Sequence, residues 1–170
     1  MIAFALLVAL AALPPLACPA GAEPRGARPP DGYEEWCEGK DPLGGPRREG
    51  PARVYYDDGG VWVEERFREG RRDGPFVEWH RNREKAREGA FLLGAKSGRW
   101  TVRWESGEVA ETSEWRDGVP HGEFVSYWPN GKRRAEGRHC GGAQCGTWRS
   151  FDEAGRELGS VGYGDQTLSP

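Results

Sequence analysis

A period of 24 residues runs through most of this 170-residue chain. Glycine opens each unit, at Gly50, Gly74, Gly98, Gly122 and Gly146. Several other columns keep the same register without an insertion, so chance agreement explains the pattern poorly. A unit this short cannot bury a core alone and has to stack on its neighbours. The sequence therefore predicts a repeat array and not a multidomain enzyme.

Aromatic side chains fill two columns of the repeat. Cross-strand aromatic pairs contribute about 0.5–1 kcal/mol each beyond the area they bury. We therefore expect the two columns to pack as a structural spine. The first column lies two residues after each opening glycine and the second lies seventeen after it: Ala52, Phe76, Trp100, Phe124 and Trp148, then Phe67, Phe91, Trp115, His139 and Tyr163.

Each unit has the pattern of a β-hairpin. Residues Gly122 to Trp128 are rich in β-forming aromatic residues, and Asn130-Gly131 can adopt the positive φ of a tight turn. Residues 132–139 form the return strand, and Gly118 marks the turn between units. No segment keeps a helical period. The expected fold is all-β, an elongated single-layer antiparallel sheet of about five 24-residue β-hairpin repeats.

The fourth unit carries a family resemblance. The segment from Trp115 to Gly131, WRDGVPHGEFVSYWPNG, is followed by Ala135-Glu-Gly137 and resembles the MORN-type repeat. More narrowly, it is similar to the bacterial variant often labelled antitoxin-like. The resemblance covers roughly residues 46–164, with the first and last units degenerate: Ala52 replaces an aromatic, and Arg83 replaces a turn glycine. It implies hairpin repeats that contact proteins or lipids and carry no catalytic residues.

The N-terminus has the pattern of an export signal. Residues 2–13 form an unbroken apolar run, which is too short to span a membrane. We therefore expect a signal peptide over residues 1–17, with a buried core helix as the alternative. Ala20-Gly21-Ala22 fits ordinary signal cleavage, whereas Leu16-Ala17-Cys18 resembles the end of a lipobox. The protein is thus expected to be an outer-membrane lipoprotein with a lipid on Cys18, or a soluble periplasmic or extracellular protein.

The chain divides into four segments on this reading. After the signal peptide, residues 18–45 are interpreted as a tether rich in proline and glycine that leads into an N-terminal arm. The repeat domain covers residues 46–164, and residues 165–170 form a tail.

The cysteines predict one disulfide. Cys140 and Cys145 flank a four-residue turn, so their Cα atoms are expected within the roughly 4.4–6.8 Å that a bridge needs. Cys37 is expected to be a free or intermolecular thiol. A metal site built from His139, Cys140, Cys145 and Cys37 is the alternative, but no C-x-x-C spacing supports it. We therefore expect no metal and no cofactor.

The charged residues read as a solvated mixed-charge surface. Glu64, Glu88 and Glu136 share one column, which favours cross-strand pairing with arginines over a catalytic carboxylate pair. His121 is expected to be a structural turn residue, and His80 a solvated one. A formal net charge of -3 gives no basis for nucleic-acid binding. Two basic clusters could meet an anionic lipid or polymer, but acidic residues are interleaved with them: Arg66, Arg68, Arg71 and Arg72, then Arg81, Arg83, Lys85 and Arg87.

The functional prediction is a non-enzymatic exported repeat scaffold that binds a protein or envelope component through its sheet face. The alternative is an antitoxin-like or immunity-type binder that neutralises one specific partner. An envelope hydrolase is a third class. The sequence does not identify the partner.

Overall fold

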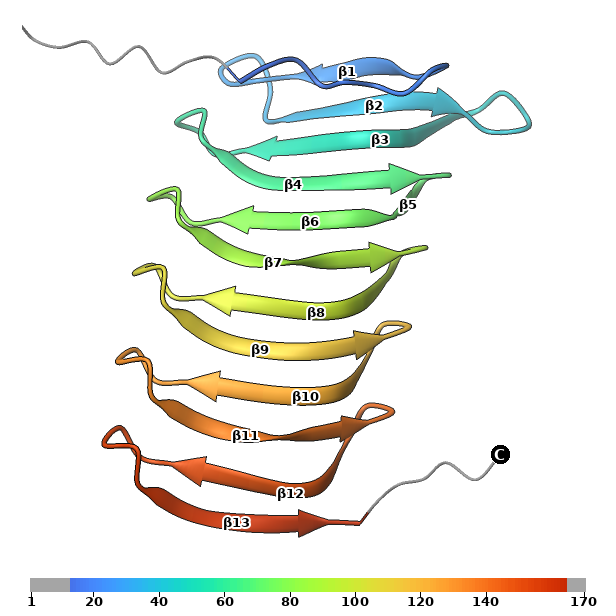
Figure 1. Ribbon diagram of the computed structural model, residues 1–170. Coiled ribbons are helices and arrows are strands. Elements are labelled where there is room, and N and C mark those ends of the chain that lie inside the picture. Colours follow the sequence, from blue (N-terminus) through green and yellow to red (C-terminus); the bar gives the residue numbers. More distant parts are fainter. Residues whose placement is uncertain (1–12, 165–170) are drawn as a thin grey trace, which may run out of the picture.

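The computed structural model describes residues 13–164, and in them the chain forms one open sheet whose paired strands are all antiparallel. Figure 1 shows the strands stacked in chain order in a single layer. Only the short strand β5, paired with β4, lies off this path. The strands are β1 (Glu23–Ala27), β2 (Glu34–Lys40), β3 (Pro46–Tyr55), β4 (Val61–Arg68), β5 (Arg71–Arg72), β6 (Gly74–Trp79), β7 (Lys85–Leu92), β8 (Ala95–Arg103), β9 (Val109–Arg116), β10 (Val119–Tyr127), β11 (Arg133–Cys140), β12 (Ala143–Phe151) and β13 (Glu157–Tyr163).

The all-β hairpin-repeat prediction is confirmed. No helix occurs within residues 13–164, so in this part of the chain none is long and apolar enough to cross a membrane. Each 24-residue unit supplies one outgoing and one returning strand, as in the pair β10–β11. A bulge recurs at the same place in the hairpins, between Ser126 and Tyr127 in the fourth unit. Bulges of this kind increase the local twist of a sheet.

The turns form where glycine was expected. In the fourth unit the amide of Gly131 donates to the carbonyl of Trp128 (2.9 Å), and the amide of Lys132 donates to the Asn130 side chain (3.0 Å). Gly131 has a φ of 78°, which glycine adopts at little cost. Arg83 takes the same place in the second unit with a φ of 71°. The turn geometry therefore persists there without its glycine.

Hydrogen bonds between turns join each unit to the next. The amide of Gly118 donates to the Lys96 carbonyl (3.0 Å), and the amide of Gly142 donates to the Pro120 carbonyl (2.9 Å). At the opposite ends of the strands, the indole of Trp128 donates to the Phe151 carbonyl (3.0 Å), 23 residues away. These bonds repeat along the array, so the turns at both ends of the strands reinforce nearest-neighbour stacking.

The N-terminal arm differs from the prediction. The interpretation of the first part of residues 18–45 as a tether is wrong, because β1 lies there and pairs with β2. β2 in turn pairs with β3, with Trp36 opposite Ala52. The aromatic that the first unit lacks at Ala52 is therefore supplied by Trp36 from the neighbouring strand. Proline and glycine did not prevent pairing because β1 is an edge strand, where the ladder tolerates them.

Candidate functional site

Two clusters of three rings form the centre of the sheet. Phe76 lies 5.5 Å from Phe91 and 5.4 Å from Trp100, measured between ring centroids. In the fourth and fifth units, Phe124 lies 5.7 Å from His139 and 5.3 Å from Trp148. Both clusters contain edge-to-face pairs, the favourable geometry for aromatic rings. The columns therefore do not form the continuous spine that was predicted.

Lys96 separates the two clusters. Its ammonium lies 4.4 Å from the ring centroid of Trp100 and 4.3 Å from that of Trp115. Burial lowers the pKa of Lys96, and nearby Arg87 lowers it further. The Trp115 indole also donates to the Ser113 hydroxyl (3.0 Å). Cation–π contacts thus replace ring-on-ring stacking at this junction.

Arginine covers the rings of the earlier units. The guanidinium of Arg48 lies 5.3 Å from the Trp36 ring and 5.2 Å from the Phe67 ring. Arg72 lies 5.2 Å from the ring of Phe91, and its Nε is 2.6 Å from a carboxylate oxygen of Glu65, which is 6% exposed. This carboxylate is therefore neutralised where it is buried, which is the usual condition for a buried charge.

The cysteines form two disulfides. The predicted bridge between Cys140 and Cys145 is present, with Cα atoms 5.8 Å apart. The prediction that Cys37 is unpaired is wrong, because Cys37 is bonded to Cys18 with Cα atoms 5.5 Å apart. The same bond contradicts a lipid on Cys18, since one sulfur cannot carry both a thioether and a disulfide. The arm folds back over β2 and so brings the two cysteines together.

The glutamate column pairs with basic residues, as predicted. Across strands, Arg53 Nε of β3 donates to Glu64 of β4 (2.7 Å), and Arg149 of β12 lies 3.5 Å from Glu136 of β11. Glu88 accepts from Lys85 (2.7 Å), whose hydrogen bond lowers the pKa of this carboxyl group. The carboxylates of this column are therefore engaged in ion pairs with basic side chains.

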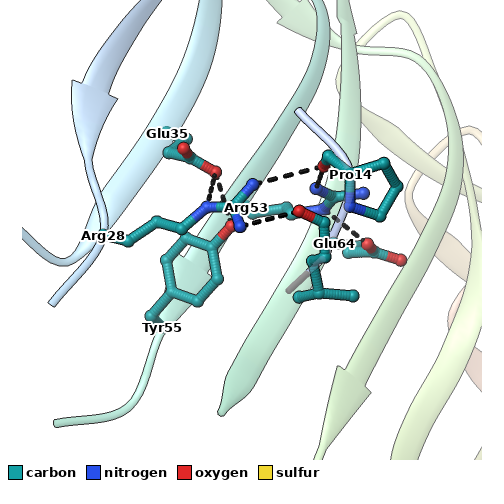
Figure 2. A network of polar contacts seen from close by, with 7 residues as sticks. Pro14, Arg28, Glu35, Arg53, Tyr55 and Glu64 are labelled. Atoms are coloured by element: carbon teal, nitrogen blue, oxygen red, sulfur yellow. Dashed lines mark hydrogen bonds and ion pairs between the residues drawn. The ribbon is translucent and has the colours of Figure 1, made fainter. Parts of the chain in front are cut away.

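A polar network holds the start of the described chain against the sheet (Figure 2). Arg28 Nε and the Tyr55 hydroxyl both donate to one carboxylate oxygen of Glu35, at 2.9 and 2.5 Å. The outer nitrogens of Arg28 donate to the carbonyls of Leu13 (2.8 Å) and Pro14 (3.2 Å). Burial, and then the Glu35 hydrogen bond, raise the pKa of Tyr55. No local sequence pattern marks this network, because its members come from four separate segments of the chain.

Within the described residues, His80 and His121 make structural contacts near turns, and no cluster of metal ligands is formed. No group of three or more His, Cys, Asp or Glu side chains within residues 13–164 is placed to hold a metal ion. A ring nitrogen of His80 lies 3.0 Å from the Arg103 carbonyl, so His80 links turns and is not the solvated residue that was predicted. The amide of Gly141 donates to Nδ1 of His121 (3.4 Å), in agreement with a structural turn role.

Two grooves on the sheet are open to solvent and have charged side chains in their walls. One is lined by Glu123, Val125, Glu136, Arg138 and Arg149, among others, between β10 and β12. Glu136 in this groove is paired with Arg133 and Arg149 (2.7 and 3.5 Å). A second groove lies between β3 and β6, where Arg53 pairs with Glu64. Both grooves are open to solvent, whereas a small-molecule site usually encloses most of its ligand.

The C-terminal end of the described sheet is uncovered. Every residue of β13 is exposed, including Leu158 (68%), Val161 (56%) and Tyr163 (40%). Elsewhere in the array, the position that corresponds to Val161 is covered by the aromatic residue of the next unit, as Trp148 covers Gly137. Within residues 13–164, β13 pairs on one side only, with β12. It therefore presents free backbone groups beside apolar side chains, the arrangement that accepts another strand.

Comparison with known proteins identifies the repeat. A family model described as MORN repeat variant matches residues 120–139, which run from β10 into β11. No curated protein matches the chain. The matched segment contains Phe124 and His139 of the second ring cluster and the Asn130-Gly131 turn. The hairpin formed by β10 and β11 is therefore similar to a MORN-type repeat.

Proposed function

We propose that this protein is an exported, non-enzymatic scaffold that binds a protein partner by adding an extended strand of that partner to β13. The open β13 edge carries the proposal. MORN repeats are often protein-binding motifs, which agrees with this function. The partner strand would continue the antiparallel ladder through its main chain, and alternate side chains would set specificity.

The faces of the sheet favour the edge as the docking site. On one face, ion pairs such as Arg53–Glu64 and Arg103–Glu88 already satisfy the charged side chains. On the ring-bearing face, Arg72 and Lys96 cover aromatic groups. β13 lacks the usual protections of an edge strand, because Glu157 is its only charged residue and it contains no proline. A partner strand rich in apolar residues would complement Leu158 and Val161.

Export is supported by the disulfide content. Two bridges, Cys18–Cys37 and Cys140–Cys145, occur in the described residues. Disulfides persist in oxidising compartments and are rare where thiols are kept reduced. The apolar run at residues 2–13 agrees with the same compartment.

Site-specific crosslinking tests the strand-addition proposal. A photoreactive residue at Ser160 of β13 is expected to capture a protein from native envelopes. The variant Val161→Lys should abolish capture, because a charge on the edge blocks strand addition. Leu43→Lys is the matched control, since Leu43 is 96% exposed in the loop between β2 and β3. Capture that survives Val161→Lys would contradict docking at β13, and capture of a toxin would favour the neutralising binder.

A further inference from the structure

We propose that Cys18 stays in the mature protein as the disulfide partner of Cys37, and that any processing of the leader occurs upstream of Leu13. The residues from Leu13 to Ala22 would then be a structural cap on the first strands of the sheet. This inference rests on the proposed export only in requiring an oxidising compartment. It replaces both the lipid anchor on Cys18 and cleavage after Ala22.

The environment of Cys37 is the first argument. Cys37 lies in the middle of β2, opposite Pro24 of β1, and is 1% exposed. Its Cβ also lies close to Gly50, the glycine that opens the first repeat. The bridge to Cys18 therefore anchors the cap on a fully buried residue of the sheet. Cleavage after Ala22 would leave this sulfur without its partner.

The packing of the cap is the second argument. The ring of Pro19 lies over Gly50, where a Cβ would come within 2.6 Å of the proline Cδ. The amide of Ala22 donates to the Pro19 carbonyl (3.1 Å), which closes a turn between Cys18 and β1. The cap thus fits a glycine site that the repeat itself provides.

The hydrogen bonds from two arginines to the main chain of residues 13 and 14 are the third argument. Arg53 donates to the Pro14 carbonyl (2.8 Å), the same oxygen that Arg28 reaches at 3.2 Å (Figure 2). Each guanidinium also uses its Nε to bind a carboxylate, Glu35 for Arg28 and Glu64 for Arg53. The remaining donors are therefore suited to neutral main-chain carbonyls, which Leu13 and Pro14 supply. The sheet positions these side chains independently of the disulfide.

The chemistry of the bridge is a two-electron oxidation. The thiols of Cys18 and Cys37 form one S–S bond and give up two protons and two electrons. The acceptor is a disulfide-bearing oxidant of the envelope, which leaves as its dithiol. Lipidation would instead place a thioether on the Cys18 sulfur, which removes the thiol that this reaction needs. The two fates of Cys18 are mutually exclusive.

Mass spectrometry of the full chain, expressed with its own N-terminus in an exporting bacterial host, tests the inference. The intact mass should correspond to an unlipidated chain that still contains Leu13 and Cys18. Non-reducing tryptic mapping should give the peptide that ends at Arg25 joined to the peptide Gly26–Lys40. A diacylglyceryl group on Cys18, or an N-terminus anywhere after Leu13, would overturn the inference.

The second disulfide is an internal control for compartment. A Cys140–Cys145 bridge found without the Cys18–Cys37 bridge would overturn this inference and leave the proposed export standing. Absence of both bridges would overturn both proposals. Neither result depends on capture of a partner at β13, which is measured separately.

Limited proteolysis gives a second readout of the cap. The Cys18→Ser variant should be cut after Arg25 at least about tenfold faster than the wild type, because the cap and β1 are no longer held to β2. The Cys140→Ser/Cys145→Ser variant is the matched control and should be cut at that site at the wild-type rate. Equal rates for all three proteins would show that the bridge does not hold the cap.

Discussion

The indole ring of Trp100 lies directly against the backbone of Gly89, where any other residue would carry its Cβ atom. Trp148 and Gly137 have the same relationship two units later. Where the smaller ring of Phe124 takes the place of tryptophan, the residue opposite it is Ser113. At the first junction the sizes are reversed, with Trp36 opposite Ala52. Each of these junctions therefore pairs a large residue with a small one.

Substitution of the glycines beneath tryptophan should destabilise the sheet. Gly89→Ala and Gly137→Ala each place a methyl group inside the indole ring, and overpacking of this kind costs about 1–3 kcal/mol. Gly159→Ala in β13 is the control, because nothing lies within 4 Å of the added atom. Urea denaturation should show a loss for the first two variants and a change below about 0.5 kcal/mol for the third. Equal effects at all three positions would contradict the size-matching argument.

A size exchange should be tolerated only as a pair. Phe124→Trp alone should destabilise the protein, because Ser113 occupies the space that the larger ring needs. Ser113→Gly alone should also destabilise it, because it opens a gap and removes the hydroxyl that Trp115 contacts. The double variant reproduces the Gly137–Trp148 pair. A double-mutant cycle should give a favourable coupling of about 1–2 kcal/mol, and simple additivity would contradict the prediction.

Deletion of whole units should be unequal although the period is kept. Removal of residues 98–121 brings Gly89 opposite Phe124, which leaves a gap beside a smaller ring. Removal of residues 74–97 brings Glu65 opposite Trp100, which crowds a buried carboxylate. The first deletion should therefore give the higher urea midpoint. Deletion of only 12 residues should be worse than both, because strand direction and register are lost.

His139 should make stability depend on pH. Burial lowers the pKa of His139, so the folded protein disfavours the protonated ring. As the pH falls below about 6.5, the unfolded chain binds this proton more readily. The free energy of unfolding should thus decrease from about pH 6.5 down to the lower pKa of the folded state, with full stability above that range.

The variant His139→Phe isolates this effect, because phenylalanine occupies the corresponding position at Phe91. As the pH falls from about 7.5 to about 5.5, the free energy of unfolding of this variant should increase relative to that of the wild type, as measured by urea denaturation. His80 and His121 remain in both proteins, so their titration contributes equally. A difference that does not change with pH would exclude His139 as the titrating group.

The sequence by itself determined the repeating part of this fold. Glycine at fixed spacing, Asn-Gly turns and β-forming aromatic residues are local signals, and each specifies a hairpin without reference to the rest of the chain. The Cys140–Cys145 bridge was predictable for the same reason, because a short turn holds the two residues opposite each other. The cross-strand pairing of the glutamate column with arginines also followed from the period.

Tertiary structure decided what happens where the period ends. Cys18 and Cys37 are 19 residues apart, and no local pattern brings them together. They meet because β1 and β2 extend the sheet beyond the first repeat, so that the arm continues the ladder instead of acting as a tether. Trp36 compensates for Ala52 through the same pairing. Such matches depend on the register between strands. Side-chain packing and the backbone hydrogen bonds set that register together, and the sequence of one strand alone does not encode it.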